Sequence, residues 1–165
     1  MVFPWISIRL SIVEIIQVTD NPQHMTRDMA QKQEIGPITG AARLLLVDDS
    51  EIERSALGTI LRRRDYEVDE AADGNAALLL LKKRAYDLLL LDLQLPGVDG
   101  FDILAFIQQS LPDLPVIVLS GLPFEEIGDG LHRIPGGELP PLIFKPVDTT
   151  QLMQVVDLKL SGELP

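Results

Sequence analysis

The chain contains no cysteine, few aromatic residues and far fewer basic than acidic residues. Without cysteine it can form neither a disulfide framework nor a thiolate metal site, and we expect a cytoplasmic protein. The 14 basic and 25 acidic residues give a net charge of −11, which makes phosphate-rich nucleic acid an unfavourable partner. The basic run Arg62-Arg63-Arg64 is better interpreted as cations near the last turn of a helix than as a nucleic-acid site.

A long uninterrupted hydrophobic run is also missing. Met1–Val18 is apolar, but Arg9 and Glu14 interrupt it. No basic segment precedes this stretch, and no small-residue cleavage site is evident. Neither a signal peptide nor a membrane span is therefore expected.

The first 40 residues differ in character from the rest of the chain. Their second half is polar and contains the breakers Asn21-Pro22 and Gly36-Pro37, which are typical of a linker. We expect residues 1–40 to form an extension, either disordered or the product of a misassigned translation start, and residues 41–165 to form the folded domain. The sequence leaves open whether the apolar N-terminal segment mediates homodimerisation.

The stretch Tyr86–Gly100 is the centre of the predicted domain. Its apolar run Leu88–Leu91 ends on a single carboxylate, Asp92, and a Pro-Gly turn follows. A short, continuous apolar run is typical of a strand that is buried on both faces of a parallel sheet. Asp92 would then lie at the carboxyl end of a central strand, where open α/β sheets bind their ligands.

From Ala41 onward, apolar strands alternate with helical segments. The expected strands are Arg43–Val47, Tyr66–Ala71, Leu88–Leu91, Pro115–Leu119 and Leu142–Phe144. The expected helices follow Ser50, cover Asn75–Arg84, Phe101–Ser110 and a weaker Pro123–Arg133, and run from Asp148 to about Leu160. Five strand-helix units in strict alternation predict an α/β fold with a doubly wound parallel sheet. Since this domain takes up most of the chain, we expect it to stand alone, without a separate output domain.

The first helix carries a recognisable start signal. Ser50-Glu51-Ile52-Glu53 matches a capping box, in which the first and last side chains each accept a hydrogen bond from the other's backbone N–H. The spacing of Ile52, Ala56, Ile60 and Leu61 predicts the face that this helix buries.

Polar residues follow four of the five predicted strands, and all four strand ends meet at one edge of a parallel sheet. These residues are Asp48-Asp49, Asp92, Ser120 and Lys145. Carboxylates held close together raise one another's pKa. A divalent cation relieves this repulsion, and Mg²⁺ prefers such oxygen ligands. The sequence therefore predicts a magnesium site at this edge.

The same residues suit phosphoryl transfer. An aspartate such as Asp92 can act as the nucleophile and form an aspartyl phosphate. The transferred group carries charge on three oxygens, which Mg²⁺, Lys145 and the Ser120 hydroxyl could neutralise. Taken singly, Ser120 would be a turn residue, Lys145 a solvated surface residue and Asp48-Asp49 a helix cap, so only their combination indicates a site.

This combination resembles the receiver domain of two-component response regulators over about residues 43–160. The resemblance implies a flavodoxin-like fold with strand order 2-1-3-4-5 and a phosphorelay role, in which Asp92 takes a phosphoryl group from a histidine kinase or a histidine phosphotransfer protein and signals to a downstream protein. It further implies that Asp49 and Asp92 bind Mg²⁺ directly, that Asp48 does so directly or through water, that Lys145-Pro146 is cis, and that the protein is a regulator rather than an enzyme.

The chain departs from the receiver pattern in two places. The aromatic switch residue expected three positions before the lysine is replaced by Leu142, and the region of the fourth helix, Leu122–Pro141, is rich in proline and glycine. The first departure motivates an alternative, a pseudo-receiver that binds partners but no longer cycles phosphate. A phosphohydrolase of the haloacid-dehalogenase type is disfavoured, because Gln94 stands where that family has a second aspartate.

Overall fold

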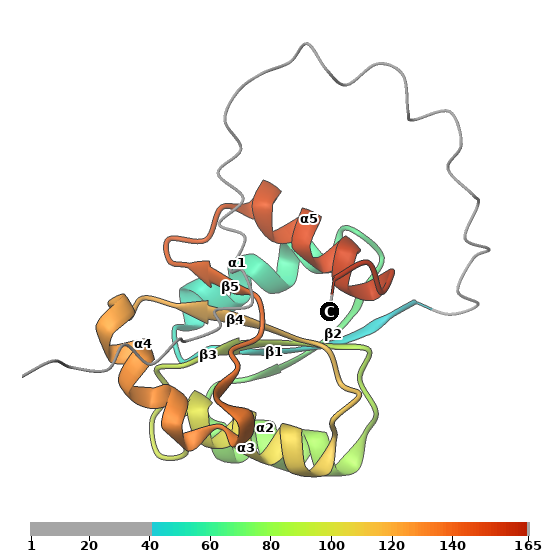
Figure 1. Cartoon of the computed structure of the whole chain (residues 1–165). Helices are drawn as coiled ribbons and strands as arrows, with labels where there is room; N and C mark the ends of the chain where they lie inside the picture. The colour runs from blue at the N-terminus through green and yellow to red at the C-terminus, as the bar shows by residue number, and fades with distance from the viewer. Residues whose placement is uncertain (1–40, 165) are drawn as a thin grey trace, which may run out of the picture. The chain divides into compact units, whose positions relative to one another are not determined.

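The computed structural model describes residues 41–164, in which five parallel strands form one sheet with helices on both faces (Figure 1). The sheet order is β2-β1-β3-β4-β5, which confirms the predicted α/β flavodoxin-like topology. The strands are β1 (Arg43–Val47), β2 (Glu67–Ala71), β3 (Leu88–Asp92), β4 (Val116–Ser120) and β5 (Leu142–Phe144). The helices are α1 (Glu51–Arg62), α2 (Gly74–Lys83), α3 (Gly100–Ser110), α4 (Phe124–Gly130) and α5 (Thr149–Leu160), with short 3₁₀ turns η2 (Leu131–Arg133) and η3 (Pro135–Gly137).

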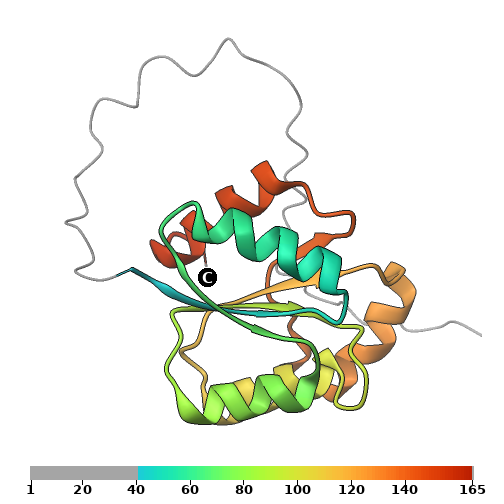
Figure 2. The same cartoon turned by 180° about the vertical axis from the view of Figure 1, so that it is seen from behind.

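The helices divide between the two faces of the sheet. Helices α1 and α5 cover one face, and α2 and α3 cover the other, as Figure 1 and the reverse view in Figure 2 show. Alternate residues of a strand point to opposite faces, so Leu44 and Leu46 pack with α1 and α5, whereas Leu45 and Val47 pack with α2 and α3. Burial on both faces explains why β3 is apolar at four consecutive positions.

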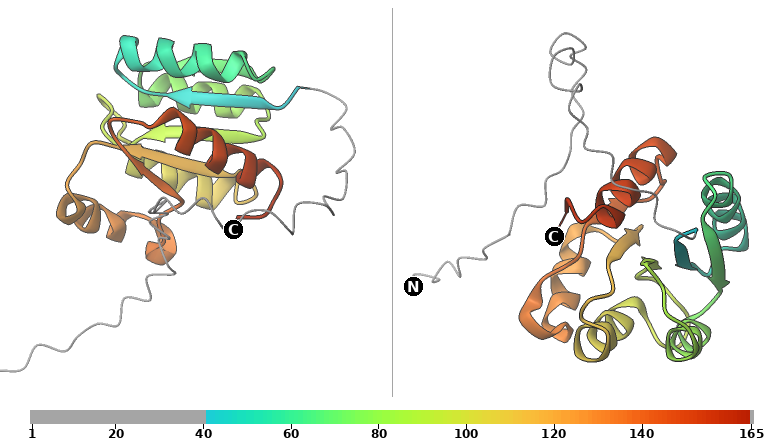
Figure 3. Two further views of the ribbon diagram at one scale, coloured as in Figure 1. Left: turned by 90° about the horizontal axis from the view of Figure 1, so that it is seen from above. Right: turned by 90° about the vertical axis from the view of Figure 1, so that its right-hand side faces the viewer.

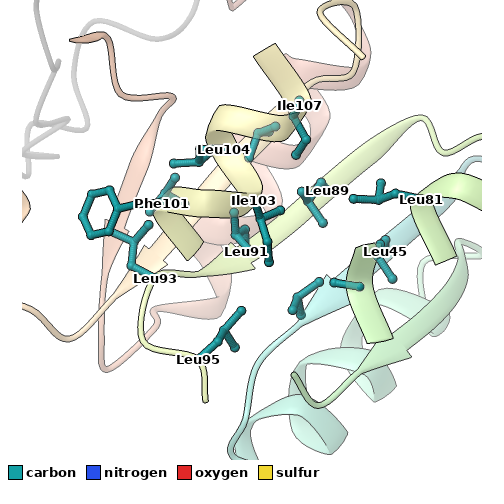
Figure 4. Packing of buried hydrophobic residues seen from close by; sticks show 14 of the residues in the cluster. Leu45, Leu81, Leu89, Leu91, Leu93, Leu95, Phe101, Ile103, Leu104 and Ile107 are labelled. Atoms are coloured by element: carbon teal, nitrogen blue, oxygen red, sulfur yellow. The ribbon is translucent and has the colours of Figure 1, made fainter. Parts of the chain in front are cut away.

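Branched aliphatic side chains fill the layer between the sheet and α2 and α3. Figure 4 shows Leu89 and Leu91 of β3 facing Ile103 and Leu104 of α3, with Leu81 of α2 beside them. All five side chains are buried, and burying each stabilises the fold by roughly 1.5–3 kcal/mol. This packing fixes β3, and therefore Asp92 at its end, at the centre of the sheet.

Aspartates start three of the helices. The side chains of Asp73, Asp99 and Asp148 accept hydrogen bonds from backbone N–H groups in the first turns of α2, α3 and α5. These groups would otherwise lack a partner inside the helix. Apart from the end of α4, the helix and strand boundaries fall within about one residue of those predicted from the sequence.

The predicted buried face of α1 is wrong in part. Ile52 is 83% exposed, and Ala56 is also exposed, whereas Leu57 and Gly58 are buried together with Leu61. A Cβ at Gly58 would lie 2.6 Å from Oε1 of Glu70. Gly58 thus packs closely against the Glu70 side chain of β2, and a glycine carries no hydrophobic signal that a periodicity analysis could detect.

The fourth helix is short. Helix α4 spans Phe124–Gly130 and is followed by η2 and η3, which agrees with the weak helical signal over Pro123–Arg133 and the predicted turn after it. The extension expected over residues 1–40 lies outside the described residues. Within residues 41–164, no helix is both long enough and apolar enough to span a bilayer.

Candidate functional site

The polar residues predicted at the strand ends lie at one edge of the sheet. Asp92 and Ser120 are the last residues of β3 and β4, and Asp48 and Lys145 directly follow β1 and β5. In the ladder Asp92 pairs with Leu119, and Ser120 pairs with Phe144. The strands run parallel, as Figure 3 (left) shows for β1 and β3, so their carboxyl ends meet.

Strand parity decides which of these side chains meet. Asp48, Asp92 and Lys145 each follow, by two residues, a leucine or isoleucine that packs toward α1 and α5. Because side chains alternate along a strand, all three point to the same side. Ser120 has the opposite parity, since Val118 packs toward α2 and α3.

The Lys145 ammonium is held by three carboxylates. Its Nζ lies 2.8 Å from Oδ2 of Asp48, 2.5 Å from Oδ2 of Asp92 and 2.8 Å from Oε2 of Glu53. The first two carboxylates are buried, and that of Glu53 is 48% exposed. The ammonium donates hydrogen bonds to Asp48 and Asp92 and forms an ion pair with Glu53.

Burial and the charges of the cluster together shift the pKa of both Lys145 and Asp92. Burial by itself lowers the pKa of Lys145, but the hydrogen bonds to Asp48, Asp92 and Glu53 outweigh it and raise this pKa above its ordinary value. The pKa of Asp92 is raised by burial and, to a smaller extent, by the charge of Asp48, although Lys145 and the backbone N–H of Gln94 oppose the shift. Several carboxylates share one ammonium. The cluster therefore stabilises the charged form of Lys145 more than it stabilises the charged form of Asp92.

The donor set fits a hard divalent cation. Carboxylate oxygens of Asp48, Asp49 and Asp92 all lie within 4.8 Å of one another. Asp48 Oδ1 accepts a hydrogen bond from Ser50 N, and Asp92 Oδ1 accepts one from Gln94 N, each at 2.8 Å. Backbone N–H groups therefore orient the two buried carboxylates. Asp49 is exposed, which leaves the cluster accessible from solvent.

Ser120 is buried beside this cluster. Its Oγ accepts a hydrogen bond from Leu122 N at 3.0 Å, and its carbonyl oxygen accepts one from Lys145 N at 2.8 Å. The hydroxyl proton is a remaining donor. The structure thus ties the backbone of Lys145 to the end of β4, next to Asp92 on β3.

Leu142 packs against the core that faces α2 and α3 and carries no aromatic ring. The rings of Phe144 and Phe124, on β5 and at the start of α4, lie 6.3 Å apart, and the two residues are 43% and 54% exposed. The aromatic side chain of β5 is therefore one residue before Lys145, with α4 as its neighbour.

An open pocket of about 690 Å³ adjoins the cluster and includes Asp49. Its wall comes from the loop after β3, from α3 and from the α4–η2 segment. Arg133 of η2 forms ion pairs with Asp99 and Asp102 at the start of α3. These ion pairs attach the Pro- and Gly-rich segment to α3.

One contact of the site was not predicted. Glu53 was expected to complete a capping box, but Ser50 N donates to Asp48 Oδ1, and the Glu53 carboxylate pairs with Lys145 instead. Only the half of the capping box in which Glu53 N donates to Ser50 Oγ is present, at 3.4 Å. An acidic residue one helical turn after an Asp-Asp pair is the signal that could have indicated this contact.

Comparisons with known proteins agree with this geometry. The family model of the response regulator receiver domain matches residues 44–157. Response regulator protein FleR of Pseudomonas aeruginosa is 30% identical over 125 residues, which cover 76% of this chain and 26% of FleR. Transcriptional regulatory protein AfsQ1 of Streptomyces coelicolor is 40% identical over 77 residues, which cover 47% of this chain and 34% of AfsQ1. The chain thus spans about a third or less of the length of these relatives.

Solved structures show the same fold. The CheY-like response regulator receiver domain protein from Methanospirillum hungatei superposes with a TM-score of 0.68 at 25% identity, covering 74% of this chain and 96% of that one. The signal receiver domain of an HD domain-containing protein from Pseudomonas fluorescens gives a TM-score of 0.67 at 31% identity, with the same coverage. The chain belongs to the family of response regulator receiver domains of two-component signal transduction.

Proposed function

We propose that Asp92 accepts a phosphoryl group from the phosphohistidine of a histidine kinase or a histidine phosphotransfer protein, and that the phosphorylated chain signals through contacts with a downstream protein. The observation that carries this proposal is the meeting of Asp48, Asp49, Asp92 and Lys145 at one edge of the sheet. A purely structural domain has no need for three converging carboxylates, two of them buried.

The chemistry is an in-line displacement at phosphorus. A carboxylate oxygen of Asp92 attacks the phosphorus atom, a P–O bond forms, the P–N bond to the donor histidine breaks, and the leaving imidazole takes up a proton. Little covalent chemistry is left to the protein, so its contribution is positioning and charge stabilisation. The hydrogen bond from Gln94 N orients the Asp92 carboxylate for this attack.

Magnesium is the cofactor that this donor set fits best. Asp49 and Asp92, with Asp48 directly or through water, would hold the ion, which would neutralise charge on one phosphoryl oxygen. Asp49, the exposed member of the cluster, leaves the ligands open to solvent on one side, as an ion that keeps several waters requires.

Lys145 and Ser120 would bind the other phosphoryl oxygens. The ammonium already contacts Asp92 at 2.5 Å, so it lies where negative charge increases on phosphorylation. The buried Ser120 hydroxyl can donate its proton to a second oxygen. The function is that of a cytoplasmic regulator, in which phosphotransfer and slow autodephosphorylation serve signalling rather than turnover of a substrate.

The test is phosphorylation of the purified full-length chain by a small phosphodonor with Mg²⁺, followed by intact mass spectrometry. We expect one added phosphoryl group, which is absent in Asp92→Asn and without Mg²⁺. Asp113→Asn is the matched control, because Asp113 is an exposed aspartate that precedes β4 and so lies at the opposite edge of the sheet. Equal labelling of Asp92→Asn and the wild type would refute the proposal.

A further inference from the structure

Three carboxylates surround the Lys145 ammonium within 2.8 Å. The three acceptors belong to Asp48, Asp92 and Glu53. An ammonium has three N–H donors and no acceptor. A phosphoryl oxygen on Asp92 can therefore bind Lys145 directly only if one of these carboxylates gives up its contact with Nζ.

The three carboxylates differ in how readily they can be displaced. Those of Asp48 and Asp92 are buried, and each is fixed by a backbone N–H on its other oxygen. The Glu53 carboxylate is 48% exposed, so water can solvate it as soon as it leaves the ammonium. An exposed ion pair contributes little to stability, whereas an unpaired buried carboxylate is unfavourable. Glu53 is thus the acceptor that the phosphoryl group displaces most easily.

The helix start explains why Glu53 reaches Lys145. In a complete capping box its side chain would accept the N–H of Ser50, but Asp48 accepts that N–H at 2.8 Å. The backbone of Glu53 remains fixed, because its N–H donates to Ser50 Oγ. The first turn of α1 thus holds Glu53 beside the site while its carboxylate is available to Lys145.

We infer that Glu53 is a positioning residue that occupies Lys145 until a phosphoryl group takes its place, and so weakens phosphoryl binding at Asp92. This inference rests on the proposed function. Besides occupying one N–H of Lys145, the Glu53 carboxylate adds a negative charge next to a site that has to accept an anion. Both effects oppose the incoming phosphoryl group.

Glu51 provides a matched control. It lies in the same first turn of α1, is exposed, and forms no ion pair among residues 41–164. Glu51→Gln and Glu53→Gln remove the same charge from the same helix turn and have the same effect on the helix dipole. Only Glu53→Gln removes a carboxylate from Lys145.

The experiment measures binding of beryllofluoride, a mimic of the phosphoryl group, to the full-length chain at constant Mg²⁺ by isothermal titration calorimetry. We expect Glu53→Gln to bind it roughly threefold to tenfold more tightly than the wild type, as a nearby unit charge in a partly solvated site would produce. Glu51→Gln should stay within about twofold of the wild type. The phosphorylation rate with a small phosphodonor should follow the same order.

The outcomes separate this inference from the proposed function. If the wild type binds beryllofluoride and Glu53→Gln binds it no more tightly than Glu51→Gln, the role of Glu53 is refuted and phosphoryl acceptance stands. If neither the wild type nor Glu53→Gln binds the mimic or accepts phosphoryl, both fail. Circular dichroism melting verifies that the variants are folded.

Discussion

The ammonium of Lys145 lies 2.5 Å from Oδ2 of Asp92, although the two residues are 53 positions apart in the chain. Lys145 follows the edge strand β5, and Asp92 ends the central strand β3. Because Asp48 and Glu53 contact the same ammonium, one cation balances several carboxylates. The stability of the fold and the chemistry of the site therefore depend on the same few charges.

Replacing Lys145 by alanine should destabilise the fold when Mg²⁺ is absent. The buried carboxylates of Asp48 and Asp92 would lose their counter-charge, and we expect the free energy of unfolding to fall by about 2–4 kcal/mol. Added Mg²⁺ should restore most of this loss. Urea denaturation with and without Mg²⁺ measures both quantities. Lys83→Ala, at an exposed position without an ion pair among the described residues, should change stability by less than about 0.5 kcal/mol. Equal stability of the two variants would contradict the prediction.

Asp92→Asn should stabilise the fold without Mg²⁺, by about 1 kcal/mol at neutral pH. Burial raises the pKa of Asp92, so the folded state binds the proton more tightly than the unfolded state. The free energy of unfolding therefore falls as the pH rises from the pKa of Asp92 in the unfolded state, about 3.9, through its pKa in the folded state. The advantage of asparagine should be small at acidic pH and complete above that window. Denaturation curves over this pH range measure the difference in stability between Asp92→Asn and the wild type. A variant less stable than the wild type at neutral pH would contradict the prediction.

Two glycines of α4 should respond to alanine in opposite directions. A Cβ at Gly130 would overlap the ring of Phe101, whereas a Cβ at Gly128 meets nothing within 4 Å. We expect Gly130→Ala to lower the free energy of unfolding by about 1–3 kcal/mol. Gly128→Ala should raise it by up to about 1 kcal/mol, because alanine favours the helix. Thermal denaturation of both variants measures the difference, and equal shifts would show that α4 does not pack as described.

The two tyrosines of the chain should titrate at high pH. Burial, together with hydrogen bonds from Tyr66 OH to Asp157 and from Tyr86 OH to Asp69, raises the pKa of both to about 12. Both stay protonated in the folded state after they would ionise in the unfolded state. Their contribution to stability is therefore complete below pH 10 and is lost between about pH 10 and 12.

The near-ultraviolet absorbance of phenolate follows this titration directly. The wild type should show two groups ionising near pH 12, and Tyr86→Phe should leave one. A phenolate midpoint near 10 in the folded protein would show that these hydroxyls are exposed and unpaired.

Much of this architecture could be predicted because burial on two faces leaves a simple signal. A run such as Leu88–Leu91 indicates a central strand, and the polar residue that ends such a strand lies at the ligand-binding edge. The meeting of Asp48, Asp92 and Lys145 follows from parallel pairing and from a side-chain period of two. Both the burial of apolar residues and the alternation of side chains repeat regularly along the chain, so they can be recognised in the sequence.

Two features could not be predicted, because they depend on single contacts and not on a repeating pattern. Ile52 looks like a core residue by spacing, but the buried face of α1 consists of Leu57, Gly58 and Leu61, with Gly58 close to Glu70. Glu53 looks like half of a capping box, but Asp48 takes its N–H donor. In both cases the local spacing allows two arrangements, and contacts made in the folded protein select one of them.

The sequence alone thus determines the alternation of strands and helices, the parallel sheet and the set of groups available for phosphoryl transfer. These features depend on burial and periodicity along the chain. Only the tertiary structure decides that Glu53 joins Asp48 and Asp92 at the Lys145 ammonium, and which side of α1 faces the sheet. Hydrogen bonds require donor–acceptor distances of about 2.7–3.2 Å, and groups from distant segments reach such distances only after these segments have packed together.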